Sequence, residues 1–140
     1  MEESLLLRQI PHSVEAEQSV LGAMLIDARC IPDVIEALHP EDFYLKTNRE
    51  IYETIYAMFN FSATIDPVTV LDQMKQRGVY DENTSRNYLL QLMEITPTAA
   101  NVKEYVRIVK DKPLLRRIAE TAGELTTLVQ EGGETGQAVL

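Results

Sequence analysis

The sequence predicts an all-α fold: a compact orthogonal bundle of several helices, followed by a truncated helical hairpin. Apolar residues recur at intervals of three and four along most of the chain, which is the spacing of one helix face. Helix-capping residues precede several of these segments. No segment shows the sustained apolar and polar alternation between hairpin turns that indicates strands. The stretch over 62–70, which is rich in β-branched residues, leaves a short strand pairing as an alternative.

The composition is that of a globular, acidic protein. Of its 140 residues, 45% are hydrophobic and 25% are charged, and the formal net charge is -9. Because such a field repels phosphate, nucleic-acid binding requires a local basic patch. The single cysteine, Cys30, excludes an intrachain disulfide. No apolar run approaches the roughly 18 residues of a membrane span, and the N-terminal segment does not resemble a secretory signal. We therefore expect a cytoplasmic protein without a membrane partner.

Two helices are predicted at the start of the chain. Ser13 is a suitable N-cap for a helix over 14–27, and Glu15 and Glu17 stand in its first turn, where the helix dipole favours acidic residues. We expect both glutamates to compensate the helix dipole. The apolar face of this helix comprises Val20, Leu21, Met24 and Leu25. A second helix over 32–38 ends at the His-Pro pair that follows, because proline disfavours helical geometry at the preceding residue.

Two further helices are predicted from their capping signals. Thr47 and Glu50 form a capping-box pattern that opens a helix over 48–60. Its apolar face comprises Ile51, Ile55, Met58 and Phe59. Asp66, followed by a proline, is an N-cap for the next helix, and Gly78 ends that helix.

The last part of the chain carries apolar faces on two different sides. A helix over 84–95 precedes another over 102–112, and beyond Pro113 the apolar face changes sides. Since proline kinks or splits a helix, we expect a globular head over 1–112 and a hairpin over 113–140, whose second helix is cut short. The first hairpin helix repeats apolar residues in threes and fours like a coiled-coil seam, and an exposed apolar stripe of this length calls for a cover. The seam comprises Leu114, Ile118, Ala122, Leu125 and Val129.

No motif in the sequence predicts catalysis, a cofactor or a metal. The glycines do not frame a phosphate-binding loop, so we expect no nucleotide hydrolysis by this chain. His12 and His39 form no metal-ligand spacing, and the adjacent Glu41 and Asp42 favour surface or capping roles. Cys30 is interpreted as an unreactive thiol. A small carboxylate-dependent enzyme remains only as a distant alternative.

A basic stripe is the clearest charge pattern. Lys103, Arg107 and Lys110 lie on one side of the predicted helix over 102–112, opposite its apolar face. A solvated helix face is the favoured interpretation, and a surface for a protein partner is the next. A nucleic-acid-binding helical module that uses these three residues is the alternative function.

Four segments, in this order and spacing, together resemble the N-terminal domain of the bacterial replicative DNA helicase of the DnaB type. They are PHSVEAEQSVLGAMLID over 11–27, PEDFY over 40–44, IDPVTVLDQMKQRG over 65–78 and TPTAANVKEYVRIVKDKPLLRRI over 96–118. Two positions depart from the family pattern. The sequence has NTSRN over 83–87 where a Gly-Gly pair is usual, and Pro113 where the family commonly has another residue.

This resemblance implies a non-catalytic collar domain of a replicative helicase. Such domains assemble with copies of themselves, from dimer to hexameric ring, and dock primase; a helicase loader is a further expected partner. Because the hairpin of such a domain pairs with a neighbouring subunit, the resemblance implies that the seam residues Leu114, Ile118, Ala122, Leu125 and Val129 form the subunit interface. The resemblance also implies that ATP, Mg²⁺ and DNA are bound by a motor domain beyond residue 140, within an ATP-dependent DNA helicase. For primase contact it points to Glu15, Tyr88 and Leu125.

Overall fold

The structure is a computed structural model that describes residues 13–111. The described residues form helices joined by turns, without a strand, so the all-α prediction is confirmed and the β-branched stretch over 62–70 does not pair. Ser13–Lys110 form one compact unit. The predicted hairpin over 113–140 lies outside the described residues, so the hairpin and the boundary before it remain predictions. Within the described part, no helix has the length and apolarity needed to cross a bilayer.

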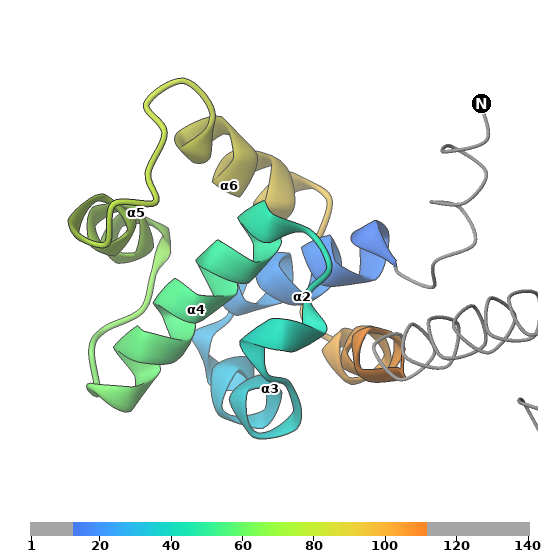
Figure 1. The fold of residues 1–140 in the computed structure, drawn as a ribbon. Helices are drawn as coiled ribbons and strands as arrows, with labels where there is room; N and C mark the ends of the chain where they lie inside the picture. The colour runs from blue at the N-terminus through green and yellow to red at the C-terminus, as the bar shows by residue number, and fades with distance from the viewer. Residues whose placement is uncertain (1–12, 112–140) are drawn as a thin grey trace, which may run out of the picture. The chain divides into compact units, whose positions relative to one another are not determined.

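Five α-helices, labelled α2 to α6, and two short 3₁₀ turns precede a last helical segment. In chain order they are α2 (Val14–Ile26), a 3₁₀ turn (Ala28–Cys30), α3 (Ile31–Ala37), a second 3₁₀ turn (Pro40–Asp42), α4 (Lys46–Asn60), α5 (Pro67–Gln76) and α6 (Ser85–Glu94), and then a helix over 102–111. Figure 1 shows α2 running behind α4, with α6 above and α3 below. Helix α2 contacts both α4 and α6, and α4 in turn contacts α3 and α5.

Most of the predicted helix ends are confirmed. The Ser13 hydroxyl accepts a hydrogen bond from the Ala16 N–H at 3.2 Å, as an N-cap should. At α5, the Asp66 carboxylate accepts from the Thr69 N–H, while the Thr69 hydroxyl accepts from the Asp66 N–H, both at 2.9 Å. Gly78 follows α5 with a φ of 75°, a left-handed conformation that glycine adopts without a steric penalty.

The predicted capping box of Thr47 and Glu50 is wrong. Helix α4 begins one residue before Thr47, and its N-cap residue, Leu45, makes no side-chain capping bond. Instead, the Glu17 carboxylate reaches from α2 and accepts hydrogen bonds from the Tyr44 N–H at 2.9 Å and the Leu45 N–H at 3.3 Å. The backbone N–H donors at the start of α4 are therefore satisfied by a long-range contact, whereas the sequence pattern predicted a local capping box there.

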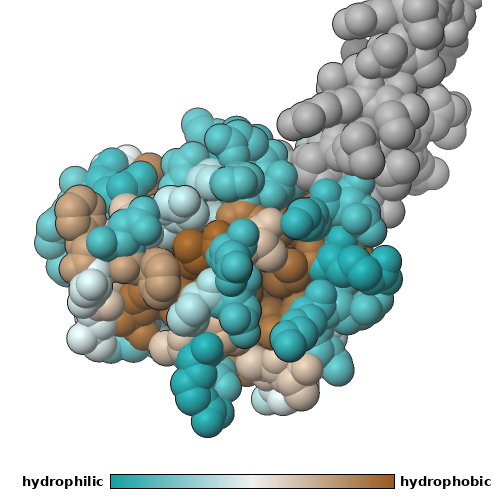
Figure 2. All heavy atoms as spheres, turned by 90° about the horizontal axis from the view of Figure 1, so that it is seen from below, coloured by the Kyte–Doolittle hydropathy of each residue, from teal (hydrophilic) through white to brown (hydrophobic). Residues whose placement is uncertain are grey.

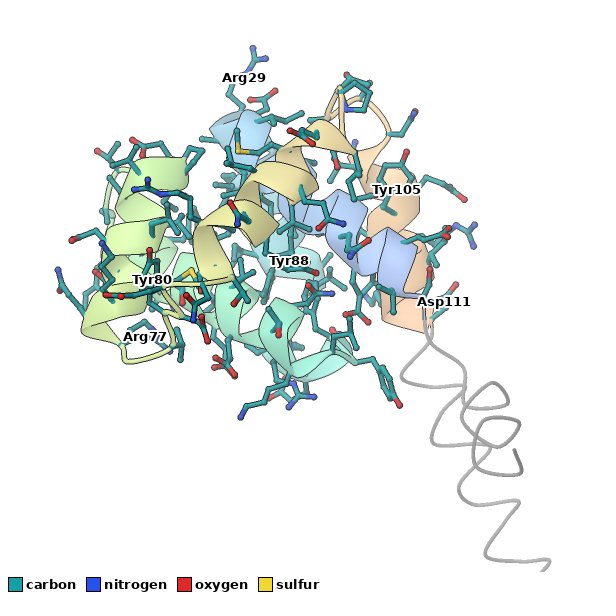
Figure 3. All side chains as sticks on the ribbon, turned by 90° about the horizontal axis from the view of Figure 1, so that it is seen from above. Arg29, Arg77, Tyr80, Tyr88, Tyr105 and Asp111 are labelled. Carbon is teal, nitrogen blue, oxygen red and sulfur yellow. The ribbon has the colours of Figure 1, made fainter. Side chains whose placement is uncertain are left out.

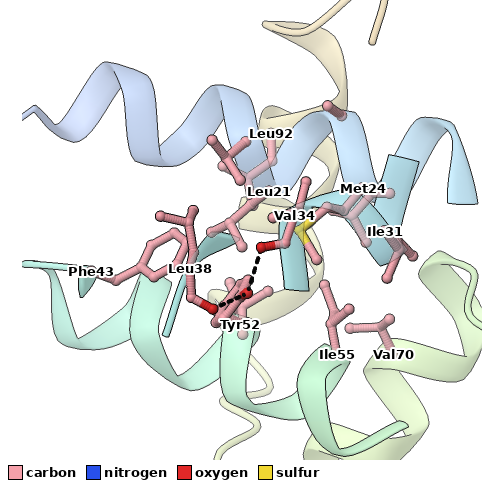
Figure 4. Packing of buried hydrophobic residues seen from close by; sticks show 14 of the residues in the cluster. Leu21, Met24, Ile31, Val34, Leu38, Phe43, Tyr52, Ile55, Val70 and Leu92 are labelled. Carbon is pink, nitrogen blue, oxygen red and sulfur yellow. Dashed lines mark hydrogen bonds between the residues drawn. The ribbon is translucent and has the colours of Figure 1, made fainter. Parts of the chain in front are cut away.

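The core lies where the helices meet, and it contains the apolar faces predicted for them. Buried residues include Val20, Leu21, Met24, Leu25, Ile51, Ile55, Met58, Leu89, Leu92, Val102 and Val109. Figure 4 shows Tyr52 among these apolar side chains. Its ring stacks on Phe43 with the centroids 4.5 Å apart, and its hydroxyl donates to the Leu38 carbonyl at 2.8 Å. Tyr52 thereby binds a carbonyl at the C-terminal end of α3, and its own buried hydroxyl has a hydrogen-bond partner.

Helices α2 and α6 approach closely at Gly22. A Cβ atom built on Gly22 would lie 2.2 Å from the Thr96 hydroxyl oxygen and 2.4 Å from the Leu92 carbonyl oxygen. Both distances are far below van der Waals contact, so the absence of a side chain at Gly22 sets how near the two helices can pack.

Polar side chains cover much of the surface of the bundle. Figure 2 shows one face, on which apolar atoms lie in the spaces between projecting polar side chains. A few large apolar side chains of the described part are nevertheless exposed, and the most exposed is Phe61, at 85%. Isolated exposed apolar residues are normal on protein surfaces, whereas neighbouring ones mark contact sites.

Candidate functional site

A groove of about 500 Å³ lies between α2, α4, α5 and α6, with Tyr88 in its wall. Its apolar lining includes Ile51 and Met74, which are almost fully buried. Polar side chains also line it: Gln18, Thr47, Glu50, Asp81, Thr84 and Ser85. An apolar lining with a few convergent polar groups is the usual composition of a binding site.

Tyr88 is held in this wall by a chain of hydrogen bonds that crosses three helices. Gln18 of α2 donates to the Tyr88 hydroxyl at 3.3 Å, and that hydroxyl donates to the side-chain carbonyl of Asn48 in α4. The Asn48 amide donates in turn to the Glu17 carboxylate at 3.1 Å. Figure 3 shows Tyr88 between the ribbons of these helices. The network fixes the orientation of the Tyr88 ring before any partner binds.

The electrostatic surroundings keep Tyr88 a neutral hydrogen-bond donor. Burial is the largest cause that raises the pKa of its phenol above the usual value, and the nearby Glu17 carboxylate raises it further. Hydrogen bonds with Gln18 and Asn48 oppose these effects. Because the net direction is upward, the hydroxyl stays protonated at neutral pH and continues to donate to Asn48.

The described part of the chain gives little support for a metal site or for a reactive nucleophile. Residues 13–111 contain no group of three or more His, Cys, Asp or Glu side chains arranged to hold a metal ion. Burial, followed by the charges of Asp27 and Asp33, raises the pKa of the half-buried Cys30 thiol to about 11. A thiol with that pKa is almost wholly protonated at neutral pH and is a poor nucleophile. The groove around Tyr88 is therefore a candidate binding surface.

Of the three residues that were predicted to contact primase, the structure describes Glu15 and Tyr88. Tyr88 lines the groove, whereas Glu15 is exposed in the first turn of α2 and is not part of the groove lining. Leu125 lies outside the described residues. So do the other predicted interface residues of the hairpin, Leu114, Ile118, Ala122 and Val129.

The basic stripe is exposed as predicted, but acidic side chains accompany it. Arg107 forms an ion pair with Glu104 on the same helix face. Lys103 and Lys110 line a hollow of about 470 Å³ together with Asp33 and Glu36 of α3. Carboxylates within the same hollow reduce the local positive potential that phosphate binding requires, so this geometry does not favour the nucleic-acid alternative.

Sequence reasoning missed Glu17, Gln18 and Asn48. Glu17 was expected only to compensate the helix dipole, but it is 1% exposed and accepts hydrogen bonds from three donors. One signal was present, because Glu17 stands three and four residues before Val20 and Leu21 and so shares their buried face. No local signal predicts Asn48 as its partner, since the two residues are 31 positions apart.

Comparison with known proteins identifies the family. Residues 9–111 match the family model described as the DnaB-like helicase N-terminal domain, which is well over half of the chain. The chain belongs to this family. The DnaB resemblance predicted from the four sequence segments is thus confirmed. The crystal structure of the N-terminal domain of DnaB helicase from Mycobacterium tuberculosis superposes with a TM-score of 0.80 at 35% identity, and the match covers 94% of this chain and 98% of that one.

Curated DnaB relatives show a similar level of identity. The replicative DNA helicase DnaB of Geobacillus stearothermophilus is 38% identical over 122 residues, covering 87% of this chain and 26% of that protein. The replicative DNA helicase DnaB of Mycobacterium leprae is 39% identical over 125 residues, covering 89% of this chain and 20% of the relative. The chain therefore spans about a quarter or less of the length of these DnaB proteins.

Proposed function

We propose that this DnaB-like N-terminal domain is the non-catalytic collar of a replicative helicase, that it supports assembly of a hexameric ring, and that it docks primase. Relatives named replicative DNA helicases, matched over most of this chain, support the parent activity. In this proposal ATP, Mg²⁺ and DNA belong to a separate motor domain, a helicase loader is a further partner, and the protein acts in the cytoplasm.

The observation that carries the docking part is the preorganised groove around Tyr88. Tyrosine is enriched among interface residues that dominate binding energy, because it combines a large apolar ring with a polar end. Hydrogen bonds from two other helices already hold the Tyr88 hydroxyl, so binding requires little ordering of this side chain. A partner side chain that enters the groove can therefore bury apolar area against the half-buried Leu45 and Val79 at low entropic cost.

The groove also favours a partner segment of a particular charge. Glu50 and Asp81 contribute carboxylates to its lining, and the whole chain carries a formal charge of -9. Opposite charges steer association and oppose wrong partners. We therefore expect the docked segment of primase to present apolar side chains together with at least one lysine or arginine.

The docking proposal is tested by obstructing the groove without disturbing the core. Thr84 is exposed, lines the groove and makes no side-chain capping bond, so Thr84→Arg adds bulk at the site with little loss of stability. Thr64→Arg, at an exposed position that is not part of the groove lining, is the matched control. We expect Thr84→Arg to weaken binding of the cognate primase about tenfold or more in isothermal titration calorimetry, and Thr64→Arg to leave it unchanged.

Equal affinity of the two variants would remove the groove from the docking proposal. Loss of binding in both would indicate a general effect of added positive charge and would contradict it as well. Circular dichroism checks that each variant keeps its helices. The assembly part is measured separately by sedimentation equilibrium, in which a strict monomer at about 1 mM chain would contradict self-association through any surface.

A further inference from the structure

Phe61 presents its ring to solvent from a fixed backbone. The residue is the C-cap of α4, and its side chain is 85% exposed. Directly after it, the Ser62 N–H donates to the Phe59 carbonyl at 3.0 Å and the Ala63 N–H donates to the Met58 carbonyl at 2.9 Å. This pair of bonds is the Schellman arrangement that ends a helix rigidly. The ring lies in solvent, although burying it would gain roughly 1.5–3 kcal/mol.

An apolar hollow of about 210 Å³ lies between α5 and α6 of the same bundle. Its lining includes Val68, Leu71, Leu90 and Met93, with Arg86 as its charged member. Val68 is 75% exposed and Leu90 is 49% exposed, so the lining lacks a cover within the described part of the chain. A cavity of about 150 Å³ in a protein core is large enough to hold benzene. The hollow therefore has room for one phenyl ring.

We infer that the ring of Phe61 in one copy of the chain inserts into the α5–α6 hollow of a second copy. This inference rests on the assembly part of the proposed function, which places several copies side by side. One chain carries both the projecting ring and an apolar recess large enough for it. Arg86 at the recess adds a cation that attracts the face of an aromatic ring.

The area of this contact sets its strength. An aromatic side chain buries about 150–250 Å², so a reciprocal pair of insertions, counting both surfaces of each contact, buries roughly 800 Å² in total. Stable interfaces bury about 1,200 Å² or more, and the like charge of two acidic copies opposes their approach. The contact is thus too weak to form a dimer at low concentration. It becomes effective when another interface keeps the copies together and raises their local concentration.

Photo-crosslinking from position 61 tests the contact directly. Phe61 is replaced by p-benzoylphenylalanine in isotope-labelled 140-residue chain, which is mixed at about 1 mM with unlabelled native chain and irradiated. Mass spectrometry then separates crosslinks between copies from those within one copy. We expect crosslinks from the labelled chain to the unlabelled peptide that contains residues 86–93. Leu90→Asp in the acceptor chain should reduce their yield about tenfold. Ile95→Asp, which changes a similarly exposed apolar residue outside the hollow, should leave the yield unchanged.

Three outcomes would overturn the inference: no crosslinks between copies, crosslinks between copies that map to another segment, or equal yields with Leu90→Asp and Ile95→Asp. Sedimentation equilibrium of the unmodified chain tests the assembly proposal independently of the crosslinking result. Oligomers without the expected crosslink would remove the Phe61 contact and leave assembly standing. A strict monomer without crosslinks would contradict both.

Discussion

Replacing Gly22 by alanine is expected to destabilise the domain by about 2 kcal/mol, although helix propensity alone predicts the opposite sign. Inside a helix, alanine is favoured over glycine by about 1 kcal/mol. At Gly22, however, the added Cβ would stand 2.4 Å from the Leu92 carbonyl oxygen and 2.2 Å from the Thr96 hydroxyl oxygen. The Leu92 oxygen belongs to the backbone of α6, so no side-chain rotation removes it from the path of the methyl group.

Relief of this overlap requires α2 and α6 to move apart, and that movement loosens the packing of buried residues such as Leu92. Overpacking of a tight core typically costs about 1–3 kcal/mol, and the upper end applies where backbone is the obstacle. Subtracting the gain in helix propensity leaves the net loss of about 2 kcal/mol. For a domain of this size, that loss lowers the midpoint of thermal unfolding by roughly 8–16 °C.

Urea unfolding followed by far-UV circular dichroism measures the effect on the free energy of unfolding. A Glu36→Ala variant, at an exposed position of α3, is the control for adding alanine to a helix and should stay within about 0.5 kcal/mol of the native chain. The double variant Gly22→Ala, Thr96→Ala should regain only part of the loss, because the Leu92 oxygen remains. A Gly22→Ala chain as stable as the native one, or more stable, would refute the close approach of α2 and α6.

Three further substitutions test the buried carboxylate and the helix ends by the same urea assay. Glu17→Ala should lower the free energy of unfolding by about 3 kcal/mol, because it leaves three buried or half-buried donors without their acceptor. The control Glu15→Ala, at an exposed position, should lower it by about 0.5 kcal/mol or less. Equal losses in the two variants would contradict the Glu17 network. Ser62→Gly should stabilise the chain by about 0.5 kcal/mol, since Ser62 has a φ of 55° that glycine adopts without strain. Gly78→Ala should destabilise the chain by about 1 kcal/mol, because Gly78 has a left-handed φ that alanine adopts only with strain. A steric clash is not the cause, since a Cβ at this position meets no atom within 4 Å. A stabilising Gly78→Ala would contradict the argument from backbone strain.

The sequence predicted the helices well because their signals are local. Ser13 and Asp66 cap the helices assigned to them, and Gly78 follows α5 as expected. Each of these residues acts on backbone groups only a few positions away, so its effect is visible in a short window of sequence. The apolar faces were predicted for a similar reason, since helical spacing alone decides which side chains share a side.

The failures share a different physical cause. Thr47 and Glu50 match a capping box, but a carboxylate 27 residues before Tyr44 takes the backbone donors at that end of α4. The same carboxylate was expected only to compensate the helix dipole, because that is the usual role of an acidic residue in the first turn of a helix. The burial of Glu17 depends on which segment packs against that turn, and the sequence of one helix does not specify its packing partner.

The sequence by itself determined that the chain is helical, where most helices begin and end, and which family it resembles. Only the tertiary structure decided which residues act together. It joined Gln18, Asn48 and Tyr88 from three helices into the wall of one groove, and it set Gly22 against α6. Capping and periodicity act over one or two turns of a helix. A groove exists only between elements that folding brings together, and its chemistry depends on pairs of residues that are tens of positions apart.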